Sequence, residues 1–174
     1  LAGKTITNLK ARLPHARAVV RSMPNLPASV GRGISGAVAS AEVTERQKLM
    51  ADRLLKGVGR VEWVDHEDLI DAVTGLSGSG PAYVFHLVEC LAKAGEAEGL
   101  PPDLAMRLAR ATVEGAGELL HRSELSAEML RQNVTSPGGT TAAGLTVLMG
   151  HEALEKLIAG TVHAARRRAA ELSG

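Results

Sequence analysis

The chain has one cysteine, one tryptophan, one tyrosine, one phenylalanine and a formal net charge of only +1. A lone cysteine excludes an intrachain disulfide and a thiolate metal cluster, so Cys90, which lies in an apolar helical run, is expected to be a buried, inert thiol. The near-neutral charge and the scarcity of aromatic side chains exclude a typical nucleic-acid-binding protein. The histidines are scattered without ligand-like pairing, so no metal site is predicted.

The sequence also lacks a run of the roughly 18 uninterrupted apolar residues that a transmembrane helix needs. No signal peptide is visible, so we expect a cytoplasmic protein with no membrane partner. Hydrophobic residues make up 45% of the 174 residues, which is enough for a core and argues against disorder. The chain begins with Leu1, and the first six residues resemble the end of a strand followed by a turn, so an upstream segment is expected.

Short β-type runs alternate with helical patterns from residue 1 to about residue 67. Strands are predicted at 18–21, 33–39 and 59–65 because β-branched or alternating residues occur there. Thr44 and Gln47 form a capping-box pattern that opens a helix ending near Lys56. Strands alternating with helices predict an α/β layer in this part of the chain.

Helical periodicity dominates after residue 67. We expect helices on both sides of an interruption at Ser77–Pro81, and then over 102–119, 127–131, 140–149 and 152–171. The fold class is therefore α/β followed by all-α, with one domain over 1–67 and a second over 68–174. The helical part is rich in small residues, and its apolar faces exceed what one copy can bury, so a symmetric dimer is expected.

The most informative segment is 132–144, with the sequence QNVTSPGGTTAAG, which is typical of a loop opening into a helix. Glycines let the backbone approach another group closely, and the N–H groups at a helix start carry the positive end of the macrodipole. The hydroxyls of Ser136, Thr140 and Thr141 surround these N–H groups. The combination suits a small carboxylate or phosphate. The alternative is an ordinary capped helix start.

The segment Asn133–Met149 (NVTSPGGTTAAGLTVLM) resembles the signature of pyrroline-5-carboxylate reductase, the enzyme that makes proline. Two further segments agree in order and spacing. Arg21–Pro27 (RSMPNLP) resembles the family's R-x-M-P-N-T-P loop, and Thr74–Tyr83 (TGLSGSGPAY) resembles its T-G-x-S-G-S-G-P-A-Y stretch. The three collinear motifs spread over most of the chain, so the match is specific.

The resemblance implies hydride transfer from NADPH to the imine carbon of 1-pyrroline-5-carboxylate, which yields L-proline in the last step of proline biosynthesis. NADH is an alternative cofactor. The family's architecture implies that residues 1–67 are the C-terminal remnant of a Rossmann-like dinucleotide-binding domain. It also implies that residues 68–174 form a helical dimerisation and substrate-binding domain, which interleaves with a second copy in a homodimer that in some members assembles further.

The resemblance also implies the substrate contacts. Residues expected to bind the substrate's carboxylate are Ser136, Gly138, Gly139, Thr140 and Thr141. The backbone N–H groups of Gly139, Thr140 and Thr141 are expected to donate, with side-chain contacts from Ser136 and Thr141. Thr74 matches the position whose hydroxyl approaches the imine nitrogen, where it positions a water or the iminium rather than supplying a proton. The alternative for Thr74 is a hydroxyl bonded to its own helix backbone.

The expected cofactor contacts lie in three segments. Met23, Pro24 and Asn25 match a loop beside the nicotinamide ribose, where Asn25 offers a donor and an acceptor. An Asx turn is the alternative role for Asn25, and Leu26 replaces the family's commoner Thr. Glu124 and the pair Asn133–Val134 resemble positions that reach the cofactor from the partner subunit or a neighbouring helix.

One family feature is missing from these residues, namely the Gly-rich turn that cradles the pyrophosphate between a strand and a helix. The string 31–36 (GRGISG) fits G-x-G-x-x-G, but it leads into a β-type run rather than a helix, so we reject it. The 174 residues alone are therefore expected to bind NADPH negligibly and to be inactive. Two alternatives to the reductase stay open: a related imine or hydroxy-acid reductase, and a non-catalytic helical dimerisation module.

Overall fold

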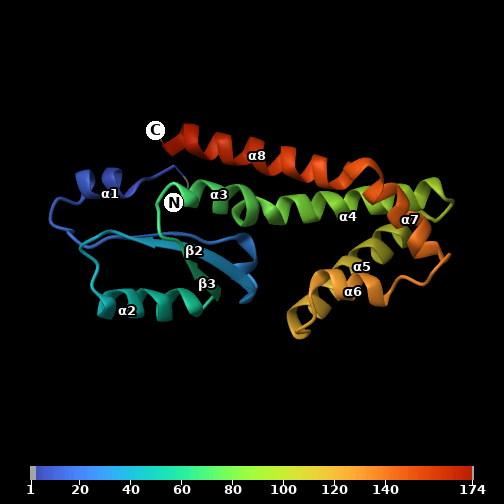
Figure 1. Ribbon diagram of the computed structural model, residues 1–174, viewed down its shortest axis with the longest axis horizontal. Helices are drawn as coiled ribbons and strands as arrows, with labels where there is room; N and C mark the ends of the chain where they lie inside the picture. Colours follow the sequence, from blue (N-terminus) through green and yellow to red (C-terminus); the bar gives the residue numbers. More distant parts are fainter. Residues whose placement is uncertain (1–2, 174) are drawn as a thin grey trace. The chain divides into compact units, whose positions relative to one another are not determined.

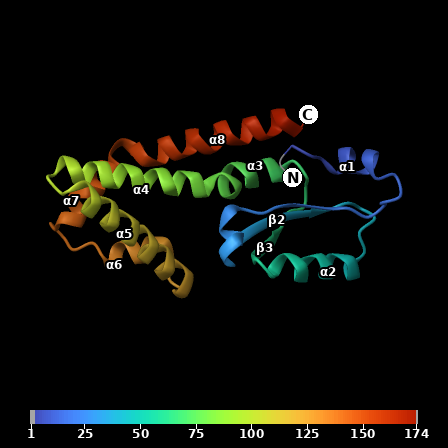
Figure 2. The same cartoon turned by 180° about the vertical axis from the view of Figure 1, so that it is seen from behind.

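The computed structural model describes residues 3–173 and divides into two units, each with its own packing. The first unit comprises residues 3–82 and 159–173, and the second comprises residues 83–158. Figure 1 colours the elements along the sequence, and Figure 2 shows them from behind. Helices α4 (Gly80–Ala97) and α8 (Ala153–Ser173) contribute residues to both units. The expected domain boundary near residue 67 stays a prediction.

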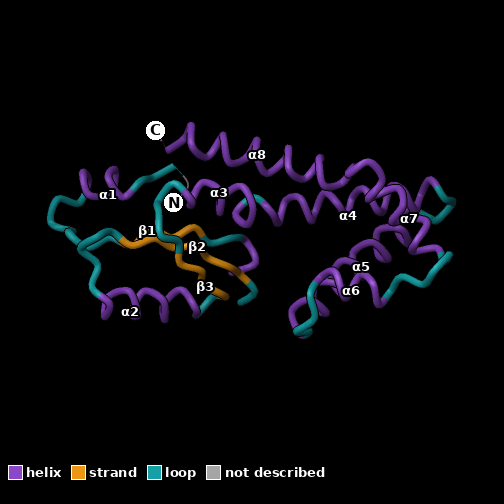
Figure 3. Tube along the Cα trace, viewed as in Figure 1, coloured by secondary structure: helices purple, strands orange, loops and turns teal. Residues whose placement is uncertain are grey.

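A three-stranded sheet forms the centre of the first unit (Figure 3). Its strands lie in the order β1 (Val20–Met23), β2 (Gly33–Ala39) and β3 (Gly59–Trp63). Strands β1 and β2 are antiparallel, whereas β2 and β3 are parallel. All three predicted strands are confirmed, with β1 placed two residues later than expected and β3 ending two residues earlier. An α/β layer followed by helices is thus the observed fold class.

The crossover between β2 and β3 is helix α2 (Glu45–Lys56), which begins with the predicted capping box. The Thr44 hydroxyl accepts from the Gln47 N–H at 3.3 Å, and the Gln47 side chain accepts from the Thr44 N–H at 2.9 Å. Two side chains of α2 contact Trp63 of β3. The indole N–H of Trp63 donates to Asp52 at 3.1 Å, and the Lys48 ammonium lies 4.9 Å from the centroid of the indole ring. These contacts attach α2 to the edge strand.

Helix α3 (Leu69–Val73) covers the opposite face of the sheet from α2 (Figures 1 and 2). The approach is close, because a Cβ at Gly36 of β2 would lie 2.6 Å from Cγ1 of Val73. The C-terminal part of α8 packs on the outer side of α3 and the turn that follows it. A Cβ at Gly75 would lie 2.9 Å from the carbonyl oxygen of Val162. Glycine is therefore required at both positions for the sheet, α3 and α8 to stack as layers.

The expected interruption at Ser77–Pro81 is a π-helical turn, η2 (Thr74–Gly78), followed by α4. The Ser79 N–H donates to the Thr74 carbonyl at 2.8 Å, a bond over five residues rather than four. Pro81 lies in the first turn of α4, where its missing N–H has no intrahelical partner. The chain therefore stays helical from α3 to α4, but with one widened turn.

The sequence analysis did not predict helix α1 (Ile6–Arg12). The Thr5 hydroxyl caps it by accepting from the Asn8 N–H at 3.1 Å. The position three residues after the cap carries Asn rather than Glu or Gln, so the capping-box pattern is absent. The sequence analysis expected the end of a strand and a turn in residues 1–6, and this segment lies partly outside the described residues.

A buried arginine joins the elements of the first unit. The side chain of Arg21 on β1 is 4% exposed, and its Nη1 lies 2.9 Å from Oε1 of Glu67. Its Nη2 lies 3.8 Å from Oδ1 of Asp71 on α3. The same Glu67 oxygen accepts from the Ile6 N–H at 2.7 Å, and the Ser173 hydroxyl donates to the Asp71 oxygen at 3.3 Å. This cluster, named here the Arg21 cluster, contacts α1, β1, α3 and the end of α8.

The second unit is helical, as expected. Apart from parts of α4 and α8, its elements are α5 (Pro102–Arg122), α6 (Ala127–Asn133), α7 (Thr140–Met149) and a 3-10 turn, Gly150–Glu152. The Ser126 hydroxyl caps α6 as predicted, accepting from the Met129 N–H at 3.2 Å. The described core residues of this unit are alanines, namely Ala92, Ala105 and Ala109.

The prediction for Cys90 is wrong. The thiol lies on the exposed side of α4, with its sulfur 3.6 Å from Nε2 of His86. Helical periodicity placed Cys90 beside apolar residues in sequence, but those residues are themselves exposed in the chain, as Leu87 and Leu91 are.

Replacing Arg21 with Met should lower the free energy of unfolding by about 3 kcal/mol, because two carboxylates lose a buried cation. Urea unfolding at one fixed protein concentration measures the change. Arg168→Met is the matched control in the same unit, since Arg168 is 67% exposed and pairs with Glu171 on the surface. That variant should lose less than about 1 kcal/mol. Equal losses in the two variants would contradict the role of the Arg21 cluster.

The loop after β2 carries a second testable ion pair. Hydrogen bonds from the Lys10 ammonium and then from Ser40 lower the pKa of Glu42 from the ordinary 4.5 to about 2. Because the folded pKa is depressed, the pair contributes fully above pH 4.5 and its contribution is lost as the pH falls towards 2. A carbon-13 NMR titration of the Glu42 carboxyl should show this midpoint.

In Lys10→Ala the Glu42 midpoint should rise towards 4.5. Lys48→Ala is the control, because the Lys48 ammonium lies over Trp63 instead. An unchanged midpoint in Lys10→Ala would show that Lys10 does not set this pKa.

Candidate functional site

Met23 is the last residue of β1, and Pro24 and Asn25 follow it in the loop at that end of the sheet. The Asn25 side-chain oxygen accepts from the Ile34 N–H at 3.0 Å, and its main-chain carbonyl accepts from the Ala28 N–H at 3.1 Å. The side chain thus bridges to β2 across nine residues instead of forming an Asx turn. The oxygen already accepts from Ile34, and the two amide N–H donors of Asn25 remain available to a ligand.

Thr74 lies at the start of the π-helical turn η2. Its hydroxyl donates to the Ile70 carbonyl at 2.8 Å, which is the local bond that the sequence analysis gave as the alternative role. A hydroxyl has one proton and two lone pairs, so an oxygen that donates its proton can still accept hydrogen bonds. Thr74 is therefore an acceptor for any group bound next to this turn.

The side chains of Met23 and Thr74 both lie close to Gly78. A Cβ at Gly78 would lie 2.8 Å from the Met23 methyl carbon and 3.7 Å from Cγ2 of Thr74. The structure thus brings together one predicted cofactor residue and the predicted catalytic residue within the first unit. The sequence analysis did not single out Gly78, although its place in the Ser-Gly-Ser-Gly-Pro segment gave a signal. Its lack of a side chain lets the Met23 methyl group reach the turn.

The segment Ser136–Gly139 leads into α7 in the second unit. Gly138 has a φ of +70°, a left-handed conformation that favours glycine. A Cβ at Gly139 would overlap the Ser136 hydroxyl oxygen, and the Gly139 N–H donates to the Ser136 carbonyl at 3.1 Å. Gly138 is thus required by its left-handed backbone conformation, and Gly139 by its close approach to the Ser136 hydroxyl.

Gly139 is the N-cap of α7, and no side chain caps this helix. The helical hydrogen bonds begin at Ala143, whose N–H donates to the Gly139 carbonyl at 3.1 Å. The N–H groups of Thr140 and Thr141 lie ahead of that bond, at the positive end of the helix. Ser136, Thr140 and Thr141 are all exposed, so their hydroxyls are accessible in the chain. A small anion can bind at such a helix start.

Three remaining predicted residues lie on either side of α6. Asn133 ends the helix and Val134 follows it, so both lead directly into the segment with Ser136. Glu124 precedes α6 and is exposed. Helix α6 is seven residues long, about 10 Å, and Glu124 precedes it whereas Asn133 ends it, so the second unit does not bring Glu124 next to this pair.

The predicted residues therefore form two groups. Met23, Pro24, Asn25 and Thr74 belong to the first unit, and Glu124 and the residues from Asn133 to Thr141 belong to the second. That the two groups serve one active site stays a prediction. The rejected string 31–36 ends in strand β2 rather than at a helix, so its rejection as a phosphate loop is confirmed.

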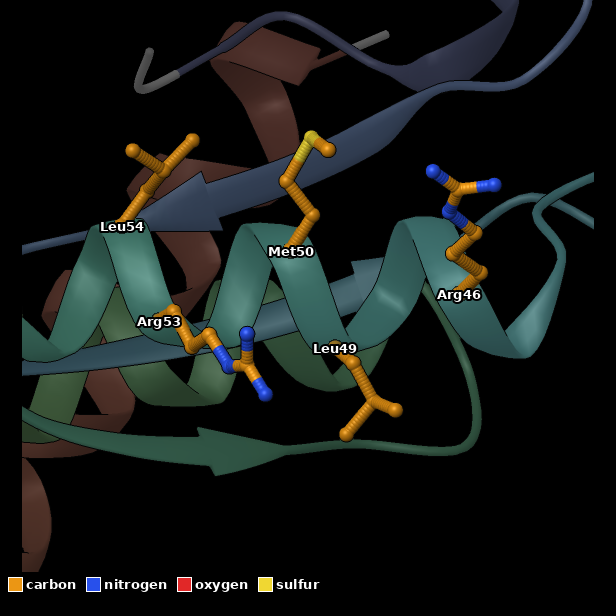
Figure 4. Close-up of a pocket in the computed structure, with 5 residues that line it drawn as sticks. All are labelled: Arg46, Leu49, Met50, Arg53 and Leu54. Carbon is orange, nitrogen blue, oxygen red and sulfur yellow. The ribbon is translucent and has the colours of Figure 1, made fainter.

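Two hollows on the surface of the described residues are lined by none of the predicted residues. One lies on the outer side of α2 and is lined by Arg46, Leu49, Met50, Arg53 and Leu54 (Figure 4). Another lies between α4 and α5 in the second unit, where Val84, Phe85, Val88, Met106 and Arg110 are among its lining residues. Neither is lined by Thr74 or by a residue of the segment 136–141.

Over residues 3–173 no cluster of three His, Cys, Asp or Glu side chains suits a metal ion. In that same range no helix combines the length and the apolar character that crossing a bilayer requires.

Comparison with known proteins gives one consistent family. Residues 67–172 match the family model described as pyrroline-5-carboxylate reductase dimerisation. The chain is 43% identical over 172 residues to a pyrroline-5-carboxylate reductase of Pseudomonas aeruginosa, covering 99% of this chain and 63% of that protein. It is 41% identical over 177 residues to a pyrroline-5-carboxylate reductase of Pisum sativum, covering 99% of this chain and 62% of that protein.

Solved structures agree. A pyrroline-5-carboxylate reductase from Coxiella burnetii superposes with a TM-score of 0.92 at 42% identity, covering 99% of this chain and 64% of that one. A pyrroline carboxylate reductase from Plasmodium falciparum, solved with NADP bound, gives 0.83 at 29% identity, covering 99% of this chain and 69% of that one. The chain thus spans less than two thirds of the length of the curated relatives described here. On this evidence, the chain belongs to the pyrroline-5-carboxylate reductase family.

Proposed function

We propose that the protein containing this chain reduces 1-pyrroline-5-carboxylate to L-proline with NADPH, with NADH as an alternative donor. The uncapped start of α7 carries this proposal within the structure, because it offers N–H groups and hydroxyls to a small carboxylate. Family membership supplies the reaction class. The domain assignment follows it, with residues 1–67 as part of the dinucleotide-binding domain and 68–174 as the dimerisation and substrate domain.

The substrate's carboxylate is held at the start of α7. The N–H of Gly139 already donates to the Ser136 carbonyl, so the donors left for the carboxylate are the N–H groups of Thr140 and Thr141. The hydroxyls of Ser136 and Thr141 add two further donors. Gly138 and Gly139 contribute by shaping the turn. The helix dipole favours the negative charge and therefore fixes one end of the substrate ring.

Thr74 is proposed as a hydrogen-bond acceptor for the imine nitrogen. Its proton is committed to the Ile70 carbonyl, so its free lone pairs suit the N–H of a protonated imine. A protonated imine is the more electrophilic form, and an acceptor that stabilises it favours attack at the neighbouring carbon. Thr74 thus positions the iminium and does not supply the proton.

The residues of the first loop fit a nicotinamide cofactor. Asn25 can donate through its amide N–H groups to a ribose hydroxyl or the carboxamide oxygen, and Met23 offers an apolar surface beside Thr74. The cofactor supplies the hydride, and the protein's task is to hold the two reacting rings together. Glu124, Asn133 and Val134 are proposed as further cofactor contacts. A cytoplasmic location stays a prediction.

The proposed partner is a second copy of the chain. The core of the second unit is built of alanines, while Phe85 on α4 is 55% exposed and Leu119 on α5 is 60% exposed. Large apolar side chains left outside such a small core favour burial against another subunit. Assembly of dimers into larger oligomers stays a prediction.

The reaction is tested by following loss of NADPH absorbance with 1-pyrroline-5-carboxylate, using the full-length protein that contains this chain. Thr141→Ala and Ser136→Ala should each raise KM for the substrate at least about tenfold, since a hydrogen bond to a charged group contributes roughly 1.5–3 kcal/mol. Thr146→Ala is the matched control, because its hydroxyl donates to the Ala142 carbonyl in the same helix.

KM in the control should stay within about twofold of the wild type. Proline binding that survives Thr141→Ala and Ser136→Ala unchanged would contradict the carboxylate assignment. No turnover by a folded, dimeric wild type would favour a non-catalytic dimerisation module. Turnover of other imines or hydroxy acids in preference would favour the related reductase.

The dimer is tested by sedimentation velocity. Phe85→Glu should shift the protein towards monomer at a given concentration, because a buried charge at an apolar interface is costly. Lys93→Glu on the same helix is the control and should leave the sedimentation coefficient unchanged, since Lys93 is exposed. A wild type that sediments as a monomer would refute the proposed assembly.

A further inference from the structure

The Arg21 cluster and the predicted reaction residues lie along the same two elements. Arg21 and Met23 are two residues apart on β1, and alternate residues of a strand point to the same face of the sheet. Asp71 and Thr74 are three residues apart on the helix, so they share one helix face. Two contacts in register therefore join β1 to α3 and η2: Arg21 with Asp71, and Met23 with Gly78, which Thr74 also approaches.

The guanidinium is held from several sides. Glu67 binds Nη1 and is itself fixed by the Ile6 N–H at the start of α1. Asp71 faces Nη2 and is fixed by the Ser173 hydroxyl at the end of α8. Because the arginine is buried and both carboxylates have a second partner, β1 cannot slide along α3 without separating these charges.

The contact with Asp71 works through charge rather than through a hydrogen bond. Nη2 and Nε of Arg21 are buried and have no hydrogen-bond partner, and the 3.8 Å separation from Asp71 exceeds hydrogen-bond distance. The two unbonded donors reduce the stabilisation that Arg21 contributes. Its charge is still required, because Glu67 and Asp71 would otherwise lose their shared buried cation.

We propose that Arg21 is a positioning residue for hydride transfer, acting through Asp71 to set the register of the loop from Met23 to Asn25 relative to Thr74. The inference rests on the proposed function. A shift of this loop by a fraction of a residue would move the nicotinamide contacts relative to the imine contact, and a misplacement of about 1 Å can lower a rate up to about a hundredfold.

The test uses Arg21→Lys and Asp71→Asn in the full-length protein, with Arg168→Lys as the matched control on the surface of the same unit. Both cluster variants should lower kcat about tenfold while leaving KM for 1-pyrroline-5-carboxylate within about twofold, because α7 holds the carboxylate. The primary deuterium isotope effect on kcat, measured with NADPH deuterated at the transferred position, should increase as hydride transfer becomes slower. The control should match the wild type in all three quantities.

A merely structural role predicts a different pattern. Loss of folded protein lowers the apparent kcat in proportion to the active fraction and does not change the isotope effect. The carbon-13 shift of the Met23 methyl group provides a second measurement, because it reports contact with η2 whether or not the enzyme turns over. Arg21→Lys should change this shift, and Arg168→Lys should not.

Wild-type turnover with an unchanged isotope effect and an unchanged Met23 shift in both cluster variants would overturn the inference alone. No wild-type turnover would overturn the proposed function, and the inference with it. Reduced kcat, a larger isotope effect and a moved Met23 shift would together support the positioning role.

Discussion

The first unit depends on one buried positive charge. Arg21 lies on β1 with its side chain almost removed from water, and it meets carboxylates of Glu67 and Asp71. Each carboxylate also accepts a hydrogen bond from another element. Glu67 accepts from the Ile6 N–H of α1, and Asp71 accepts from the Ser173 hydroxyl in the last turn of α8. Elements far apart in sequence are therefore joined by charge around a single side chain, and apolar packing fills the space between them.

Small residues set the distances between the layers. Gly36 and Gly75 let α3 contact the sheet on one side and α8 on the other, and Gly78 admits the Met23 methyl group to the π-helical turn. In the second unit the buried apolar residues are also small, namely Ala92, Ala105 and Ala109. Close helix packing through small residues leaves larger apolar side chains on the outside, which is the physical reason for proposing a second copy as their partner.

Local hydrogen bonds determine which donors and acceptors of each polar side chain remain available to a ligand. The Thr74 hydroxyl donates its only proton to the Ile70 carbonyl, so its oxygen can act only as an acceptor towards a ligand. The Asn25 oxygen already accepts from Ile34, and its amide N–H groups are available to donate. These are opposite roles, and they suit a protonated imine and an oxygen-bearing cofactor group respectively. The local hydrogen bonds of Thr74 and Asn25 therefore limit which ligand groups these side chains can bind, and they are compatible with the proposed roles.

Local sequence signals predicted the three strands, the Thr44 capping box and the starts of α5, α6 and α7, because caps, prolines and β-branched runs act over a few residues. The motifs around Met23, Thr74 and Ser136 likewise identified the candidate residues and the family. The sequence missed α1 and misplaced Cys90, since a Thr-Asn cap is a weaker signal and helical periodicity does not say which apolar face another element covers. Only the tertiary structure paired Arg21 with Asp71 and brought Met23 to Gly78 next to Thr74, because those contacts join positions about fifty residues apart through packing and buried charge, which no local pattern encodes.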